Sequence, residues 1–123
     1  MRLSHRKVVL VGLFSARVPN PGAELLSLAN LLEAAGAQVV GRLLQRRGVS
    51  RAKGPGGAKR MEAPLAATVI GAGKARELAT LCGETGADLV VSWNELTERQ
   101  RQELEKATGV QVQAATAIGL KLA

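Results

Sequence analysis

The chain has 123 residues, which is the usual size of one domain with one modest core. Its residues are 46% hydrophobic, with one Trp, one Phe and no Tyr, so we expect an aliphatic core and exclude a surface that stacks bases on aromatic rings. The net charge is +7, a single cysteine excludes an internal disulfide, and no apolar run is long enough to span a membrane.

The first predicted strand is the aliphatic run at residues 8–13, which follows a basic N-terminus. This beginning is not typical of a signal peptide, because the run stops at Gly12 without a cleavage pattern, so we expect a cytoplasmic protein. A helix follows, with Asn20 as its N-cap, Pro21 in its first turn and Gly36 at its end. The stripe that would face the sheet is Leu25, Leu28, Ala29, Leu32 and Ala35.

A second strand at residues 39–45 runs into a glycine-rich segment without helical periodicity. Between residues 42 and 60 the chain has seven basic residues and no acid, so the other ten basic residues balance the ten acids and the whole excess lies here. The seven are Arg42, Arg46, Arg47, Arg51, Lys53, Lys59 and Arg60. We expect a flexible basic loop at about residues 47–64 that either contacts a polyanion or is simply solvated.

The next predicted strand, residues 67–70, follows without a helix and can pair antiparallel with its predecessor. It enters a helix through the turn Gly71-Ala72-Gly73-Lys74. This turn is not a P-loop, because one residue instead of four separates its glycines and Ala75 stands where Ser or Thr should be. Gly71, Gly73 and Lys74 therefore form either a structural turn or the site of a single anion at a helix N-terminus.

Two more helices and strands repeat the pattern. One helix carries the stripe Ala75, Leu78, Ala79 and Cys82, stops at Gly86 and precedes a strand at residues 89–91. The other begins with a capping box of Thr97 and Gln100, carries Leu104 and Ala107, and stops at Gly109 before a strand at residues 110–112. This alternation predicts one α/β domain over residues 1–123, a three-layer fold with a mostly parallel four- to five-stranded sheet and helices on both faces.

Candidates for catalysis are lacking. Cys82 lies on an apolar stripe as a core residue, and His5 lies in a solvated tail. The acids and bases between residues 95 and 106 alternate as on an exposed, ion-paired helix face. Ser92, Trp93 and Asn94 follow a strand at the edge where α/β sheets bind ligands, so they are a possible ligand crevice, with Trp93 as a cover of the core as the alternative. We expect no enzyme, no metal and no cofactor.

The order of these pieces resembles the N-terminal domain of the HflX family of ribosome-associated GTPases, from about residue 7 to residue 112. The most specific matches are Val40-Gly41-Arg42 with Gln45-Arg46-Arg47, the turn from Ile70 to Lys74, and Glu95-Leu96 with Gln100 and Leu104-Glu105. The tail at residues 113–120 departs from the family's Asp-Arg-Thr-Gly segment, and no GTPase motif occurs. We therefore expect an excised domain or, as the altered tail favours, a standalone relative.

The resemblance implies the large ribosomal subunit or another RNA as a partner, and ATP binding has been attributed to this region in some family members. Our leading hypothesis is a ribosome- or RNA-binding module in which the seven basic residues contact phosphates and Gly71, Gly73 and Lys74 hold one more. The alternatives are a nucleotide phosphate-binding domain at residues 71–74 and a protein-interaction module. The latter includes binding to a GTPase-bearing protein or a homodimer through an edge strand. No membrane partner is expected.

Overall fold

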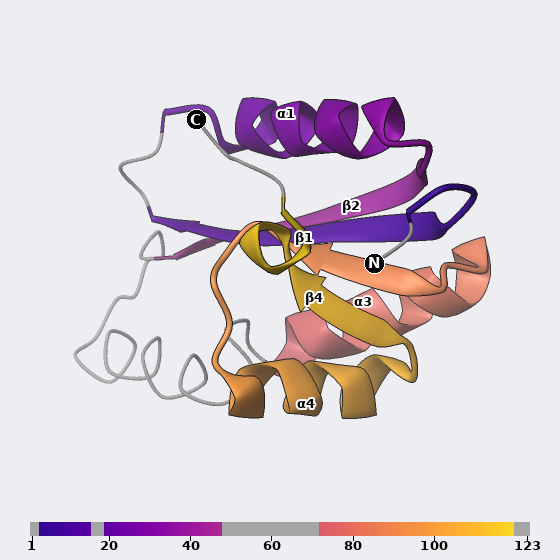
Figure 1. Cartoon of the computed structure of the whole chain (residues 1–123). Helices are drawn as coiled ribbons and strands as arrows, with labels where there is room; N and C mark the ends of the chain where they lie inside the picture. Colours follow the sequence, from indigo (N-terminus) through magenta and orange to yellow (C-terminus); the bar gives the residue numbers. More distant parts are fainter. Residues whose placement is uncertain (1–2, 16–18, 48–71, 120–123) are drawn as a thin grey trace.

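A computed structural model of the chain describes residues 3–15, 19–47 and 72–119. Four parallel strands form one sheet in the order β2-β1-β3-β4 (Figure 1). The strands are β1 at Lys7–Ser15, β2 at Gln38–Arg47, β3 at Leu89–Ser92 and β4 at Gln111–Ala114. This arrangement confirms the predicted α/β class and the parallel sheet. The predicted strand at residues 67–70 lies outside the described residues.

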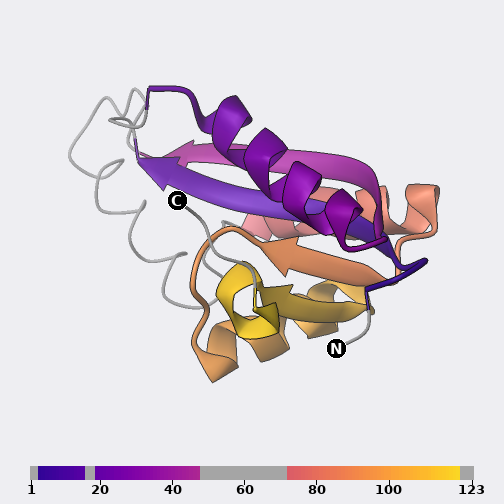
Figure 2. The ribbon, with the colours of Figure 1, turned by 45° about the horizontal axis from the view of Figure 1, so that its top comes forward.

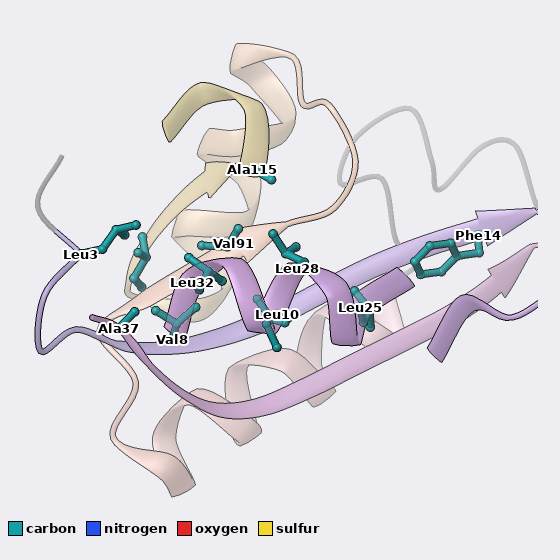
Figure 3. Close-up of a cluster of buried hydrophobic side chains, with 12 residues drawn as sticks. Leu3, Val8, Leu10, Phe14, Leu25, Leu28, Leu32, Ala37, Val91 and Ala115 are labelled. Carbon is teal, nitrogen blue, oxygen red and sulfur yellow. The ribbon is translucent and has the colours of Figure 1, made fainter. Parts of the chain in front are cut away.

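Helices cover both faces of the sheet, which gives three layers (Figures 1 and 2). Helix α1 at Pro21–Ala34 packs on one face with the short 3-10 helix η1 at Ala115–Ile118. Helices α3 at Ala72–Thr85 and α4 at Glu98–Thr108 pack on the other. Each face has an aliphatic core; on the α1 side, Leu28 and Leu32 lie against Val8 and Leu10 of β1 (Figure 3). The core therefore follows the stripes that the sequence predicts.

The helix ends follow local sequence signals. Asn20 Oδ1 accepts a hydrogen bond from the Ala23 N–H, and Thr97 and Gln100 form both bonds of the predicted capping box. Gly36, Gly86 and Gly109 have φ values of 96°, 72° and 75°, which confirms left-handed glycines at all three joints.

Two alanines of the predicted packing stripes are exposed. Ala35 is the C-cap of α1, one residue beyond the last helical turn, and its side chain does not reach the sheet. Ala107 is exposed because α4 buries Leu104 and turns most of its surface to solvent. The predictions for these two residues were wrong. Helix α1 ends before Ala35, and α4 packs beside the edge strand β4 with only a narrow stripe of buried surface.

The outer edge of β4 is occupied by a side chain. Glu105 of α4 reaches across and accepts a hydrogen bond from the Val112 N–H at 2.9 Å. Arg101 holds the same carboxylate, with its Nη1 2.7 Å from Glu105 Oε2. At the opposite edge, β2 has no partner strand within the described residues. Among the described residues, a backbone N–H at the β4 edge is therefore bonded to a side chain, whereas β2 has no neighbouring strand on its outer side.

Cys82 lies in the core between α3 and the sheet with 3% of its surface exposed, which confirms its predicted place. Burial raises the pKa of its thiol, so less of the reactive thiolate is present at a given pH. We expect Ellman's reagent at pH 8 to label the native protein at least about 100-fold more slowly than the urea-denatured chain, because labelling requires opening of the core. Equal labelling rates, measured by absorbance, would contradict this burial.

Candidate nucleic-acid interface

Arg42 is the residue of the predicted basic cluster whose side chain the structure describes, and it is exposed on β2, the edge strand among the described residues. A bulge precedes it, because Val8 pairs with Val39 whereas Val9 pairs with Gly41. Arg42 follows this irregularity and lines hollows on both sides of β2, one toward α1 and one toward α3. The bulge therefore sets a cation at the rim of the sheet.

Gly41 lets α3 approach β2 closely. A Cβ atom at this position would lie 3.1 Å from Leu81 Cδ2 of α3, which is tighter than an ordinary contact. The absence of a side chain here allows the helix to settle against the edge strand. Between them lies an open hollow of about 660 Å³, lined by Arg42, Leu43, Arg76, Glu77, Thr80, Leu81 and Glu84.

The rest of the basic cluster lies at or beyond the end of β2. Arg46 and Arg47 are the last residues of β2, and the structure describes their backbone only. The positions of Arg51, Lys53, Lys59, Arg60 and Gly71 lie outside the described residues, so their part in the interface stays a prediction. Because α3 runs back against the strands before the parallel β3, residues 47 and 72 both lie toward the carboxyl end of the sheet (Figure 1).

The predicted turn at residues 71–74 is shorter than expected, because Ala72, Gly73 and Lys74 already belong to α3. Lys74 lies in its first turn, with Nζ 2.9 Å from Glu77 Oε1. This intrahelical ion pair draws the lysine toward an acid of its own helix. An anion at the helix N-terminus would have to compete with Glu77 for Lys74, and the nucleotide hypothesis stays a prediction.

Ser92, Trp93 and Asn94 do lie together at the carboxyl end of the sheet. Ser92 Oγ accepts a hydrogen bond from the Asn94 N–H at 3.0 Å. Asn94 Oδ1 accepts from the Leu13 N–H at 2.8 Å, and its Nδ2 donates to the Leu13 carbonyl at 3.0 Å. The centroid of the Trp93 ring lies 4.5 Å from the centroid of the Phe14 ring, which agrees with the predicted role of Trp93 as a cover of the core. The side chains of Ser92 and Asn94 are thus engaged within the fold, whereas the buried Trp93 Nε1 has no hydrogen-bond partner among the described residues.

The carboxylates of α4 form ion pairs along an exposed helix face, as the sequence predicts. Arg101 lies between Glu98 and Glu105 and contacts both. Its hydrogen bond to Glu98 is the main cause that lowers the pKa of that carboxyl. The pKa of Arg101 is raised, again chiefly by the bond to Glu98. These shifts stabilise the charged forms, which is the behaviour of a surface ion-pair network and not of a proton-transferring pair.

Comparison with known families adds a match over most of this fold. The model for the GTP-binding GTPase N-terminal family matches residues 23–122, from the first turn of α1 to beyond η1. The chain belongs to this HflX-type family. A comparison with curated proteins found no match.

In this HflX-type domain the residues that carry the family resemblance lie on elements at opposite edges of the sheet. Val40, Gly41 and Arg42 form the bulged part of β2, whereas Gln100 and Leu104 lie on α4 at the other end of the sheet. Within the described ranges, no group of three or more His, Cys, Asp or Glu side chains is placed to hold a metal ion. Among the helices of the same ranges, none is long and apolar enough to cross a membrane.

The residue that the sequence did not single out is Arg76. It lies two positions after Lys74 and four before Thr80, and both Arg76 and Thr80 are exposed toward the hollow beside Arg42. A signal was present, because residues 76, 80 and 84 recur at helical spacing opposite the buried stripe of α3. The spacing alone could not show which strand lies next to this face of α3.

Proposed function

We propose that this HflX-type domain is a non-enzymatic module that binds RNA, and specifically the large ribosomal subunit. The observation that carries the proposal is the segment from residue 42 to residue 60, with seven basic residues and no acid. It starts on the edge strand β2, where Arg42 is exposed. A cation cluster of this size favours a polyanion, because each phosphate contact releases counterions from the nucleic acid.

The chemistry of the chain favours recognition of backbone and shape. With one Trp and one Phe, which pack on each other, the described surface has no aromatic platform for an unpaired base. A binding role without catalysis is supported by the ion-paired carboxylates of α4 and by the burial of Cys82. A GTPase-bearing protein is a further proposed partner, because the family is the N-terminal part of GTP-binding proteins. Ribosome binding would place the chain in the cytoplasm.

Co-sedimentation with purified large ribosomal subunits over a series of KCl concentrations tests the proposal. We expect binding at low salt, with the logarithm of the association constant falling linearly against the logarithm of the salt concentration. Seven phosphate contacts would give a slope of about −5 to −6. Absence of binding at low salt, or binding that does not change with salt concentration, would refute the proposal that this domain binds RNA.

A further inference from the structure

We propose that Arg76 extends the RNA-binding surface from β2 onto α3, so that a phosphate of the RNA backbone sits between Arg42 and Arg76 in the hollow that these elements form. This inference rests on the proposed function and adds to it a site on described residues. The hollow of about 660 Å³ is large enough for a nucleotide unit.

The fold brings the two arginines to one place. Arg42 lines the hollow from the edge strand and Arg76 lines it from the helix, and both are exposed. Because Gly41 has no side chain, Leu81 of α3 can pack closely over β2. Guanidinium groups offer paired N–H donors that match phosphate oxygens, and the exposed Thr80 hydroxyl adds a neutral donor one helical turn away.

The hollow is unevenly charged along its length. Arg76 lies in the first half of α3, at the end of the helix to which the chain returns from the basic segment. Glu84 lies eight residues later, about 12 Å along the helix axis, near its other end. Glu77 lies beside Arg76, but its charge is offset by Lys74 at 2.9 Å. A phosphate is therefore favoured at the Arg76 end of the hollow.

The first test replaces Arg76 with alanine and measures co-sedimentation with large ribosomal subunits across the same KCl series. We expect Arg76→Ala to bind about two- to fivefold more weakly at low salt, and the magnitude of the salt slope to fall by about one. The matched control is Arg99→Ala, which removes an exposed arginine from α4 near the opposite edge of the sheet. We expect this control to bind like the wild type.

The outcomes separate the inference from the proposed function. If the wild type binds and Arg76→Ala keeps its affinity and slope, the site on α3 is refuted and the RNA-binding module stands. If the wild type does not bind at low salt, both are refuted. Because Arg76 is exposed, we expect the Arg76→Ala variant to unfold at the same temperature as the Arg99→Ala control. Equal unfolding temperatures would show that weaker binding by Arg76→Ala does not come from a loss of folded protein.

A second pair of variants tests the site by a gain of binding. Glu77→Gln removes an acid beside the hollow and frees Lys74 from its ion pair, so we expect binding to tighten about two- to fivefold. Glu84→Gln makes the same charge change at the far end of the hollow, and its effect should be smaller. Equal effects of the two variants, or weaker binding by Glu77→Gln, would contradict a phosphate at the Arg76 end.

Discussion

Replacing Asn94 with alanine is expected to lower the free energy of unfolding by about 2–4 kcal/mol. The strand β3 ends at Ser92, and from there the side chain of Asn94 continues the pairing with β1. Its Oδ1 accepts from the Leu13 N–H and its Nδ2 donates to the Leu13 carbonyl. Leu13 is 7% exposed, so in Asn94→Ala both of its backbone groups would lose their partner in a place that water reaches poorly.

An aspartate at the same position gives a sharper test. Asn94→Asp keeps an acceptor for the Leu13 N–H but turns a second oxygen toward the Leu13 carbonyl, so we expect a loss similar to that of alanine at neutral pH. Repulsion from the carbonyl raises the pKa of this aspartate above its unfolded value. Its destabilisation should therefore shrink as the pH falls through that raised pKa, because the protonated carboxyl can donate to the carbonyl.

Urea unfolding followed by the fluorescence of Trp93 measures both variants, because Trp93 is the one tryptophan of the chain and adjoins Asn94. The matched control is Asn30→Ala, at an exposed position of α1, which should stay within about 0.5 kcal/mol of the wild type. If Asn94→Ala and Asn30→Ala unfold at the same urea concentration, the two bonds to Leu13 do not stabilise the fold as we argue.

Neutralising the basic segment should have the largest effect on binding. We expect the quadruple variant Arg51→Ser, Lys53→Ser, Lys59→Ser and Arg60→Ser to bind large ribosomal subunits about 10- to 1,000-fold more weakly, if each lost contact contributes up to about 1 kcal/mol. The salt slope should flatten by about three to four, because fewer counterions are released. Co-sedimentation over the KCl series measures both quantities.

A charge-matched comparison isolates the segment from the overall charge. The double variant Arg51→Ser with Lys53→Ser removes two positive charges from the segment, and Arg99→Ser with Lys106→Ser removes two from α4, where both side chains are exposed. We expect the first pair to weaken binding and the second to leave it near the wild-type value. Equal losses would mean that the subunit responds to net charge alone, and the segment would lose its assigned role.

The fold could be predicted from the sequence because its signals are local. The Thr97–Gln100 capping box and the glycines at 36, 86 and 109 act over a few residues, and the structure has each of them where the sequence places it. The aliphatic runs at residues 8–13 and 89–91 predict strands buried on both faces, as found in β1 and β3. Local chemistry decides these features, whatever the order of strands.

The features that the sequence did not predict depend on the order of the strands in the sheet. Asn94 forms hydrogen bonds with Leu13, 81 residues away, because β3 lies beside β1 in the sheet. No local sequence pattern predicts that these two residues are neighbours. Arg76 and Arg42 line the same hollow because α3 packs on β2, and the bulge near Val40 decides which side chains of β2 face the helix. The hydrogen bonds of Ser92 and Asn94 stabilise the end of the sheet, and the ligand crevice that the sequence predicts at these residues stays a prediction.

The bond from Val112 to Glu105 has a consequence for how copies of the chain can associate. A sheet grows into a fibril only when each added copy presents a fresh edge to the next, which requires two open sides. Here the carboxylate of Glu105 occupies a donor at the β4 side, and Arg101 holds it there. A second copy that paired with β4 would first have to displace this carboxylate from the Val112 N–H, so the described β4 edge resists the addition of a strand.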